Sequence, residues 1–412
     1  MIDVITFGCR LNAYESEVIR RSAAAAGLAD AVIVNTCAVT AEAERQARQA
    51  IRKARRERPG AKLVVTGCSA QITPERYAAM DEVDAVIGNQ EKLSPKAFAD
   101  LEVAPTVGDI MAVSETAGHL IEGFEGRSRA FMQIQNGCDH RCTFCIIPFG
   151  RGPSRSVTVS DVVAQAKRLY DNGYREIVLT GVDIGDYGKD LEPKGNIAGL
   201  VAALLQSLPE DMRVRITSID PVEVSAALID LYARDARLLP HWHLSVQSGD
   251  DMVLRRMARR HRRADVLSVC SALRAARPDT VIGADFIAGF PTETEEQFAT
   301  TLAVVAEADL ALLHVFPYSE RAGTAAATMP GWPKAIRRAR AADLRAAGQR
   351  QLSSTLDRFV GRRVDAVVEG PNVARTDHFL PVAIETPAPP GHRVAVSVTG
   401  HTGDTLLGVV HG

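Results

Sequence analysis

Three cysteines, Cys138, Cys142 and Cys145, stand close together in the run GCDHRCTFC. Thiolates are soft ligands, which favour zinc, copper(I) or iron-sulfur clusters over hard cations. A four-iron cluster that is held by three cysteines keeps one iron free for a substrate or a cofactor. The spacing therefore predicts a metal centre with an open coordination position, where chemistry can take place.

Zinc is the alternative occupant of this triplet. A structural zinc site has four ligands, often as two separated pairs of Cys or His. His140 is the nearby residue that could complete such a set. We favour the iron-sulfur cluster, because a residue between two ligands easily points away from the metal.

The other four cysteines of the chain are Cys9, Cys37, Cys68 and Cys270. Cys270 lies in an expected helix and is interpreted as a core residue. There is no signal-peptide pattern and no apolar run long enough to span a membrane, so we expect a cytoplasmic location with reduced thiols. Unusual cysteine spacings in that compartment indicate metal binding or catalysis rather than disulfides.

A four-iron cluster with one open iron can bind the amino and carboxylate groups of S-adenosylmethionine (SAM). One-electron reduction then releases an adenosyl radical, so the cofactor carries the difficult chemistry. The protein has to hold that cofactor and exclude water. These tasks require a defined scaffold around the cysteines.

The length and composition of the chain are those of a globular protein with two or three domains. It has 412 residues, of which 46% are hydrophobic and 24% are charged. The formal net charge of -2 neither indicates nor excludes a nucleic-acid partner, because such binding depends on local basic patches.

The first 115 residues alternate short apolar segments with helical ones. Such segments are typical of parallel strands buried on both faces. We expect strands at 2–7, 31–35, 63–66 and 85–88, and a helix at 41–58. Cys9, Cys37 and Cys68 each follow a strand, at the sheet edge where open α/β sheets bind ligands. They indicate a second three-thiolate site, with three inert core thiols as the alternative.

Longer strand and helix units follow from about residue 131 to 318. This pattern predicts a partial (β/α)6 barrel with its active site at the C-terminal ends of the strands. Polar residues near the later strand ends, Ser218, Gln247 and Asp285, are candidates for binding the cofactor, with ordinary loop or cap residues as the alternative. The six expected strands are 131–135, 176–180, 213–217, 243–246, 281–286 and 312–316.

The C-terminal part has a different pattern. Segment 333–360 is expected to form one or two connecting helices. Residues 362–412 contain Val- and Thr-bearing runs broken by Gly and Pro, which is typical of a small antiparallel β-barrel. Such barrels often bind nucleic acid and often do not, so composition leaves RNA binding open.

Two basic stretches could contact a polyanion. Arg151 and Arg155 follow the cysteine run, and segment 255–263 holds six arginines and His261. Arginine suits bidentate phosphate contacts. A solvated helix face is the alternative for the second stretch.

Several segments of the chain are similar to one family. Together they resemble the radical-SAM methylthiotransferases along essentially the whole length. LTGVDIGDYG and HVFPYS are most similar to the branch that modifies N6-threonylcarbamoyladenosine in tRNA. The segments are GCRLNAYESE, NTCAVT, GCSAQ, GCDHRCTFCIIPFGRG, LTGVDIGDYG, SVQSGDD, DFIAGFPTETEEQF and HVFPYSERAGT.

The resemblance implies an α/β protein of three domains. These are an open parallel-sheet methylthiotransferase domain at 1–115, a radical-SAM partial barrel at 125–345 and a TRAM-like RNA-binding barrel at 350–412. Two [4Fe-4S] clusters are implied, one on Cys138, Cys142 and Cys145 that cleaves SAM, and an auxiliary one on Cys9, Cys37 and Cys68.

The implied reaction places a methylthio group on C2 of the adenine at tRNA position 37. One SAM would supply the methyl group and a second the radical. The implied partners are the tRNA anticodon loop, whose unpaired bases can be splayed out, and an electron donor. Val157, after RGPSRS, departs from the basic run that is usual in the family, so the RNA contacts there are not carried over.

Other functions stay open beside this one. A methylthiotransferase could act instead on isopentenyladenosine-37 of tRNA or on a ribosomal-protein aspartate. A non-enzyme alternative is a zinc-containing RNA-binding protein, which the iron content of the protein would distinguish.

Overall fold

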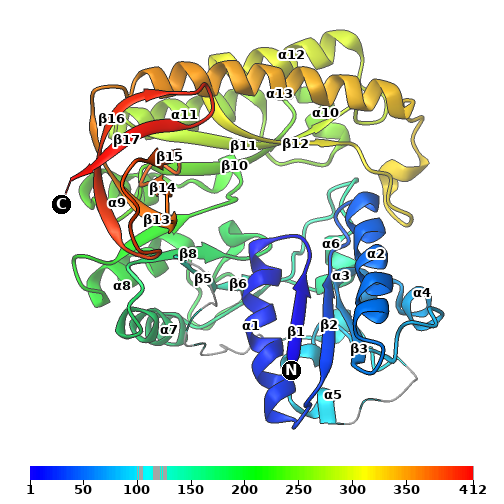
Figure 1. Ribbon diagram of the computed structural model, residues 1–412. Helices are drawn as coiled ribbons and strands as arrows, with labels where there is room; N and C mark the ends of the chain where they lie inside the picture. Colours follow the sequence, from blue (N-terminus) through cyan, green and yellow to red (C-terminus); the bar gives the residue numbers. More distant parts are fainter. Residues whose placement is uncertain (100, 102–104, 115–120, 122, 124–127, 412) are drawn as a thin grey trace.

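The computed structural model describes residues 1–99, 101, 105–114, 121, 123 and 128–411. Figure 1 shows an N-terminal sheet with its helices, an arc of strands and helices from green to yellow, and a small red C-terminal barrel. The sheets and the closed C-terminal barrel confirm the predicted α/β fold class.

The N-terminal region is an open parallel sheet with the strand order β1-β2-β3-β4. Every residue of β2 is buried, as expected for a strand covered on both faces. The helices α1 and α2 connect successive strands, so the carboxyl ends of all four strands lie at one edge. The elements are β1 (Ile2–Thr6), α1 (Arg10–Ala25), β2 (Ala31–Thr36), α2 (Ala41–Glu57), β3 (Lys62–Gly67), α3 (Cys68–Ile72), α4 (Pro74–Ala78), β4 (Ala85–Val86), η1 (Glu91–Leu93), α5 (Lys96–Ala99) and η2 (Ile110–Ala112).

Six parallel strands form the partial barrel that the sequence predicts. They make two three-stranded sheets, β5-β8-β9 and β10-β11-β12, which the parallel bridges Val214–Leu238 and Ile219–Leu244 join. The strands are β5 (Ala130–Gln133), β8 (Glu176–Thr180), β9 (Arg213–Ile216), β10 (His241–Gln247), β11 (Val281–Ala288) and β12 (Leu310–Pro317). The first strand ends two residues earlier than expected. A hairpin of two short antiparallel strands follows it, β6 (Gln135–Asn136) and β7 (Arg155–Ser156), and its long connecting loop carries the three cysteines of the run GCDHRCTFC.

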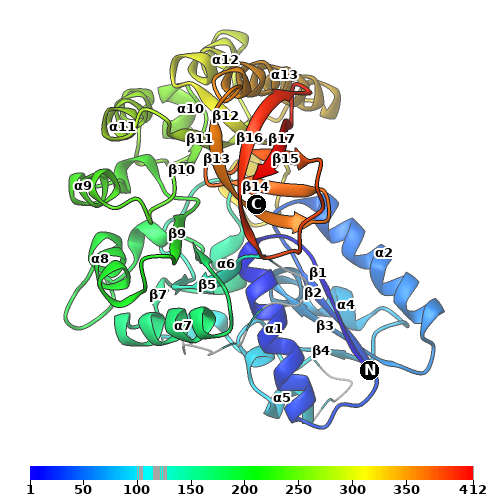
Figure 2. The ribbon, with the colours of Figure 1, turned by 60° about the vertical axis from the view of Figure 1, so that its left-hand side comes forward.

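Helices cover the outer side of this arc (Figure 2). They are α7 (Val159–Asp171), α8 (Ile197–Ser207), α9 (Ala226–Arg234), α11 (Arg263–Ala276) and α12 (Glu295–Glu307), with short α6 (Ile147–Arg151), η3 (Ile184–Asp186), η4 (Pro221–Glu223) and α10 (Asp251–Arg256) in the loops. The barrel core also includes Tyr14 and Val18 of α1. The N-terminal region thus packs directly against the barrel.

The C-terminal region is a closed five-stranded barrel of the order β13-β14-β15-β17-β16. Its strand pairs are antiparallel as predicted, except that β15 and β17 run parallel. Its core includes Val281 and Ala311, so it packs on the N-terminal ends of β11 and β12. The elements are η5 (Ala325–Thr328), α13 (Lys334–Asp357), β13 (Arg363–Gly370), β14 (Val373–Thr376), β15 (Pro381–Ile384), β16 (Arg393–His401) and β17 (Leu406–His411).

The expected domain limits stay a prediction. The first limit, between 115 and 125, falls on residues that lie mostly outside the described part of the chain. The second, between 345 and 350, lies within the continuous helix α13. Among the described residues, no helix is both long and apolar enough to cross a membrane.

Candidate active site

The loop that carries Cys138, Cys142 and Cys145 follows the hairpin strand β6 at the C-terminal face of the barrel. Gly137 enters it with a φ of 72°, and a Cβ there would lie 1.8 Å from the carbonyl oxygen of Pro153. The Thr143 amide donates to the carbonyl of Met257 at 3.1 Å, and the Ala326 amide donates to that of Thr143 at 2.8 Å. The barrel therefore fixes the loop from both sides.

The three thiols of this loop influence one another. Burial raises the pKa of Cys145 to about 11, and the nearby Cys142 contributes to the shift. Burial likewise raises the pKa of Cys138, with the Asp183 carboxylate and the other two thiols as further causes. Arg259 donates to the Cys142 sulfur at 3.6 Å. The Cys138 and Cys145 thiols keep their protons when no metal is bound. A bound metal group would replace the protons, and the nearby Arg259 would compensate the negative charge of the thiolates.

The structure also brings Cys9, Cys37 and Cys68 to one edge of the N-terminal sheet. Cys9 precedes α1, Cys37 follows β2, and Cys68 begins α3. Gly8 has a φ of 91°, and a Cβ there would lie 2.6 Å from the Cys37 sulfur. Burial raises the pKa of Cys37 to about 12, and Cys68 and Cys9 add to this shift. The βα spacing of the sequence therefore predicted their convergence correctly.

The two cysteine triplets lie against each other through α3 and α6. Ile146, next to Cys145, packs with Ala38, next to Cys37, and with Cys68. The side-chain amide of Asn89 lies 3.6 Å from the Cys68 sulfur and donates to the Gly150 carbonyl at 2.6 Å. This contact between the N-terminal region and the barrel could not be predicted from spacing along the chain.

Arg151 and Arg155 do not form the surface contact that the sequence suggested. Arg151 is only 2% exposed, and it donates to Glu15, Asn12 and Asn136. Arg155 is also buried and donates to the carbonyls of Pro153 and Arg151. The expectation that they meet a polyanion is therefore wrong, because buried protein acceptors already bind both guanidinium groups.

The basic stretch 255–263 has two different roles. Arg259 and Arg260 pair with Asp220 and Glu223 at 2.6 and 2.5 Å, and His261 is buried beside Asp220. Arg255 and Arg262 are exposed. Most of the stretch thus forms ion pairs and hydrogen bonds that hold the segment after β10 in place, and only part of it is a solvated surface.

Two of the three candidate cofactor contacts lie at the ends of neighbouring strands, and the third lies within the next strand. Ser218, just beyond β9, and Gln247, at the end of β10, have positive φ values of 53° and 67°. Non-glycine residues with this backbone are uncommon, and they cluster at functional sites. Asp285, on β11, instead accepts from His243 at 2.9 Å and from His314 at 3.2 Å.

An acidic cluster that sequence reasoning missed lies beside Cys138. His140 contacts Asp183 and Asp186, each at 3.0 Å, and Glu223 completes the group. Asp183 raises the pKa of His140. His140 therefore faces carboxylates. The sequence signal for this cluster was the segment LTGVDIGDYG, in which Asp183 and Asp186 are about one helical turn apart.

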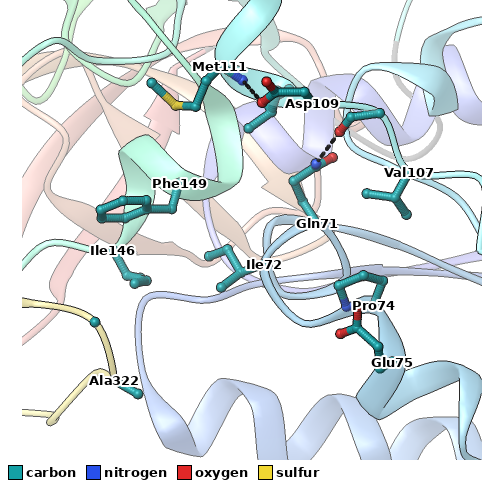
Figure 3. Close-up of a pocket in the computed structure, with 13 residues that line it drawn as sticks. Gln71, Ile72, Pro74, Glu75, Val107, Asp109, Met111, Ile146, Phe149 and Ala322 are labelled. Atoms are coloured by element: carbon teal, nitrogen blue, oxygen red, sulfur yellow. Dashed lines mark hydrogen bonds between the residues drawn. The ribbon is translucent and has the colours of Figure 1, made fainter.

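A hollow of about 580 Å³ is lined by Ile146 and Phe149, which directly follow the cysteine loop. Figure 3 shows Ile72, Ile146, Phe149 and Met111 around it. The Gln71 side chain donates a hydrogen bond to the Gly108 carbonyl, and the Met111 amide donates one to the Asp109 carboxylate. Phe149 is 46% exposed. The hollow thus offers an apolar surface next to both triplets.

Comparison with known proteins agrees with this arrangement. Residues 132–305 match the radical SAM superfamily, and residues 1–88 match the uncharacterized protein family UPF0004. The chain is 52% identical, over 93% of its own length and 91% of the relative's, to the threonylcarbamoyladenosine tRNA methylthiotransferase MtaB of Rickettsia prowazekii. The chain belongs to the radical-SAM methylthiotransferases. This confirms the family that the sequence segments indicated.

Other members of the family are more distant. The MtaB of Bacillus subtilis is 38% identical over 79% of this chain and 74% of its own. The tRNA-2-methylthio-N(6)-dimethylallyladenosine synthase of Anaeromyxobacter dehalogenans is 34% identical over 99% of this chain and 93% of its own.

A solved structure shares the fold of this methylthiotransferase. It is the radical S-adenosylmethionine methyltransferase TsrM from Kitasatospora setae, with a TM-score of 0.52 and 15% identity. The match covers 75% of this chain and 66% of that one.

Proposed function

We propose that this chain places a methylthio group on C2 of N6-threonylcarbamoyladenosine at position 37 of tRNA. The observation that carries the proposal is the 52% identity, over nearly the whole chain, to a relative named for a tRNA carrying threonylcarbamoyladenosine. The packing of two thiol triplets against each other supports it, since such a reaction needs a radical source beside a sulfur source.

The cofactors of this family member are SAM and two [4Fe-4S] clusters. When bound, they supply the one-electron chemistry and the iron-bound sulfur. Cys138, Cys142 and Cys145 would hold the cluster that binds SAM, and Cys9, Cys37 and Cys68 would hold the auxiliary one. The donor sets suit these groups, because each triplet contains three free thiols that affect one another.

Buried cations would compensate the negative charge of thiolate ligands. Arg259 lies at the Cys142 sulfur. Arg151 and Lys92 lie near Cys68. Burial alone would lower the pKa of Arg151, but the charge of Cys68 helps to raise it. Ser218 and Gln247, at the adjoining strand ends, would contact SAM. Asp285 would contribute to the same cofactor site through His243 and His314, which bind its carboxylate.

The partner would be the anticodon loop of tRNA, with a separate protein as electron donor, and the reaction would take place in the cytoplasm. Unpaired bases stack on exposed aromatic and apolar side chains. Val39, Phe149 and Phe316 are exposed by 46%, 46% and 39%, and they flank Cys37, the cysteine loop and the end of β12. This surface supports RNA binding beside the two triplets.

Nucleoside analysis of tRNA tests the proposal. A host that lacks this chain should lose 2-methylthio-N6-threonylcarbamoyladenosine and regain it with the wild-type gene. Unchanged levels of that nucleoside would refute the proposal. Loss of a methylthiolated isopentenyladenosine, or of a methylthiolated ribosomal-protein aspartate, would assign one of the alternative substrates.

Metal analysis tests the non-enzyme alternative. Anaerobically purified protein should contain about eight irons per chain, the sum of two four-iron clusters. Zinc without iron would instead support a zinc-containing RNA-binding protein.

A further inference from the structure

Arg10 is the first residue of α1 and directly follows Cys9. Its guanidinium lies 5.6 Å from the centre of the Phe379 ring, which belongs to the turn between β14 and β15 of the C-terminal barrel. Arg10 lines a hollow of about 210 Å³ together with Phe131, Val178 and Phe379. All three domains therefore contribute to the surroundings of this side chain.

Three other arginines surround the same ring. The guanidiniums of Arg129, Arg215 and Arg375 lie 5.9, 4.9 and 4.8 Å from its centre. Each of them has a carboxylate partner. Glu176 contacts Arg129 at 3.0 Å and Arg215 at 2.7 Å. Glu369, which also lines the hollow, contacts Arg129 at 2.5 Å and Arg375 at 3.0 Å.

Arg10 lacks such a partner. Within the described part of the chain it forms no hydrogen bond or ion pair, and its guanidinium lies over the Phe379 ring. Asp285 is the carboxylate that attracts it, but His243 and His314 already bind that carboxylate. The guanidinium of Arg10 is a cation at neutral pH, as for every arginine side chain.

A partly buried cation without an acceptor is costly for the folded protein. Such a group is stabilised when an anion enters. Guanidinium binds a carboxylate through two parallel N–H donors, and the apolar side chains of Phe131, Val178 and Phe379 can contact a short aliphatic group beside it.

We propose that the hollow at Arg10 binds the carboxylate of the threonylcarbamoyl group and thereby selects this modified adenosine. The inference rests on the proposed function. The threonylcarbamoyl group ends in a carboxylate, whereas a dimethylallyl group has no charge. Arg10 is also adjacent to Cys9, and thus to the auxiliary thiol triplet at which the adenine ring would react.

The experiment uses the full chain with both clusters loaded and two synthetic anticodon stem-loops. One carries N6-threonylcarbamoyladenosine, and the other carries the same group with its carboxylate converted to a neutral methyl amide. Wild type, Arg10→Gln, Arg10→Lys and the control Arg234→Gln are compared by kcat/KM for methylthiolation. Arg234 is exposed on the outer helix α9. Iron per chain is measured for each variant.

Wild type and the control should prefer the carboxylate RNA. Arg10→Gln should lower kcat/KM for that RNA by about 10- to 100-fold, the usual effect of losing a charge-assisted hydrogen bond, and leave the amide RNA nearly unchanged. Arg10→Lys should keep part of the preference, since it keeps the charge.

Equal loss on both RNAs would overturn the inference, because it would indicate a phosphate contact or a structural role. No loss on either RNA would also overturn it. If Arg10→Gln failed to load iron, an Arg10→Lys variant without any preference for the carboxylate would overturn it as well. A wild type that methylthiolates neither RNA would refute the proposed function itself, a result distinct from the others.

Discussion

Arg151 donates to both carboxylate oxygens of Glu15, with its two terminal nitrogens at 2.8 and 2.9 Å. Glu15 also accepts from Lys92 at 2.8 Å. This buried group joins α6, which follows the loop of Cys138, Cys142 and Cys145, to α1, which follows Cys9. The distance between the two proposed clusters is therefore set by charged groups as well as by the packing of Ile146 on Cys68.

Replacement of Arg151 by methionine should separate these two regions. Among the described residues the change leaves Glu15 with Lys92 as its one cation. Breaking a buried ion pair in this way costs about 3 to 5 kcal/mol. We expect a lower free energy of unfolding in urea and fewer irons per chain. Arg234→Met, in an exposed ion pair on α9, is the matched control and should change the stability by less than about 1 kcal/mol. Equal stability of the two variants would contradict a linking role for Arg151.

The same group predicts how stability depends on pH. Burial opposes ionisation of Glu15, but Arg151 and Lys92 outweigh it and lower the pKa to about 2, from 4.5. The ionised form therefore stabilises the fold above pH 4.5, and this stabilisation is lost as the pH falls toward 2.

Urea unfolding of cluster-free protein between pH 4.5 and 3 measures this loss. Wild type should lose about 1 kcal/mol more per pH unit than Glu15→Gln, near the limit for one group. Parallel pH profiles of the two proteins would show that Glu15 does not carry the effect.

Gly137→Ala should disable the cysteine loop specifically. The new Cβ would lie 1.8 Å from the Pro153 carbonyl oxygen, so the backbone has to move at Cys138. Gly173→Ala is a matched control, since Gly173 has a similar positive φ of 92° but nothing within 4 Å of the added atom. Both changes carry the left-handed penalty of about 1 to 2 kcal/mol. Only Gly137→Ala should also reduce iron to about four per chain, the content of one four-iron cluster.

The two triplets should be separable by single substitutions. Cys138→Ala should abolish reductive cleavage of SAM, measured as 5′-deoxyadenosine. Cys37→Ala should retain that cleavage and lose methylthiolation, since it removes a ligand of the auxiliary site. Each variant should keep about four irons. Methylthiolation by Cys37→Ala protein would contradict the role given to the N-terminal triplet.

Local sequence predicted most of the scaffold. The apolar runs located the buried strands β2 and β3 within a residue or two, and the spacing of Cys9, Cys37 and Cys68 predicted their shared sheet edge. The reasoning failed for Arg151, which a basic run suggested was a surface residue. An arginine can be buried when a distant carboxylate meets it, and Glu15 is 136 residues away in the chain.

The sequence by itself determined which chemistry is possible here. Six cysteines at two regular sets of spacings, with family segments along the chain, are local features that need no knowledge of the fold. Only the tertiary structure decided which charges are satisfied. It paired Arg151 with Glu15 and Arg259 with Asp220, and it left Arg10 beside Phe379 without an acceptor among the described residues. Pairing of buried charges depends on contacts between segments far apart in the chain, and local spacing does not encode such contacts.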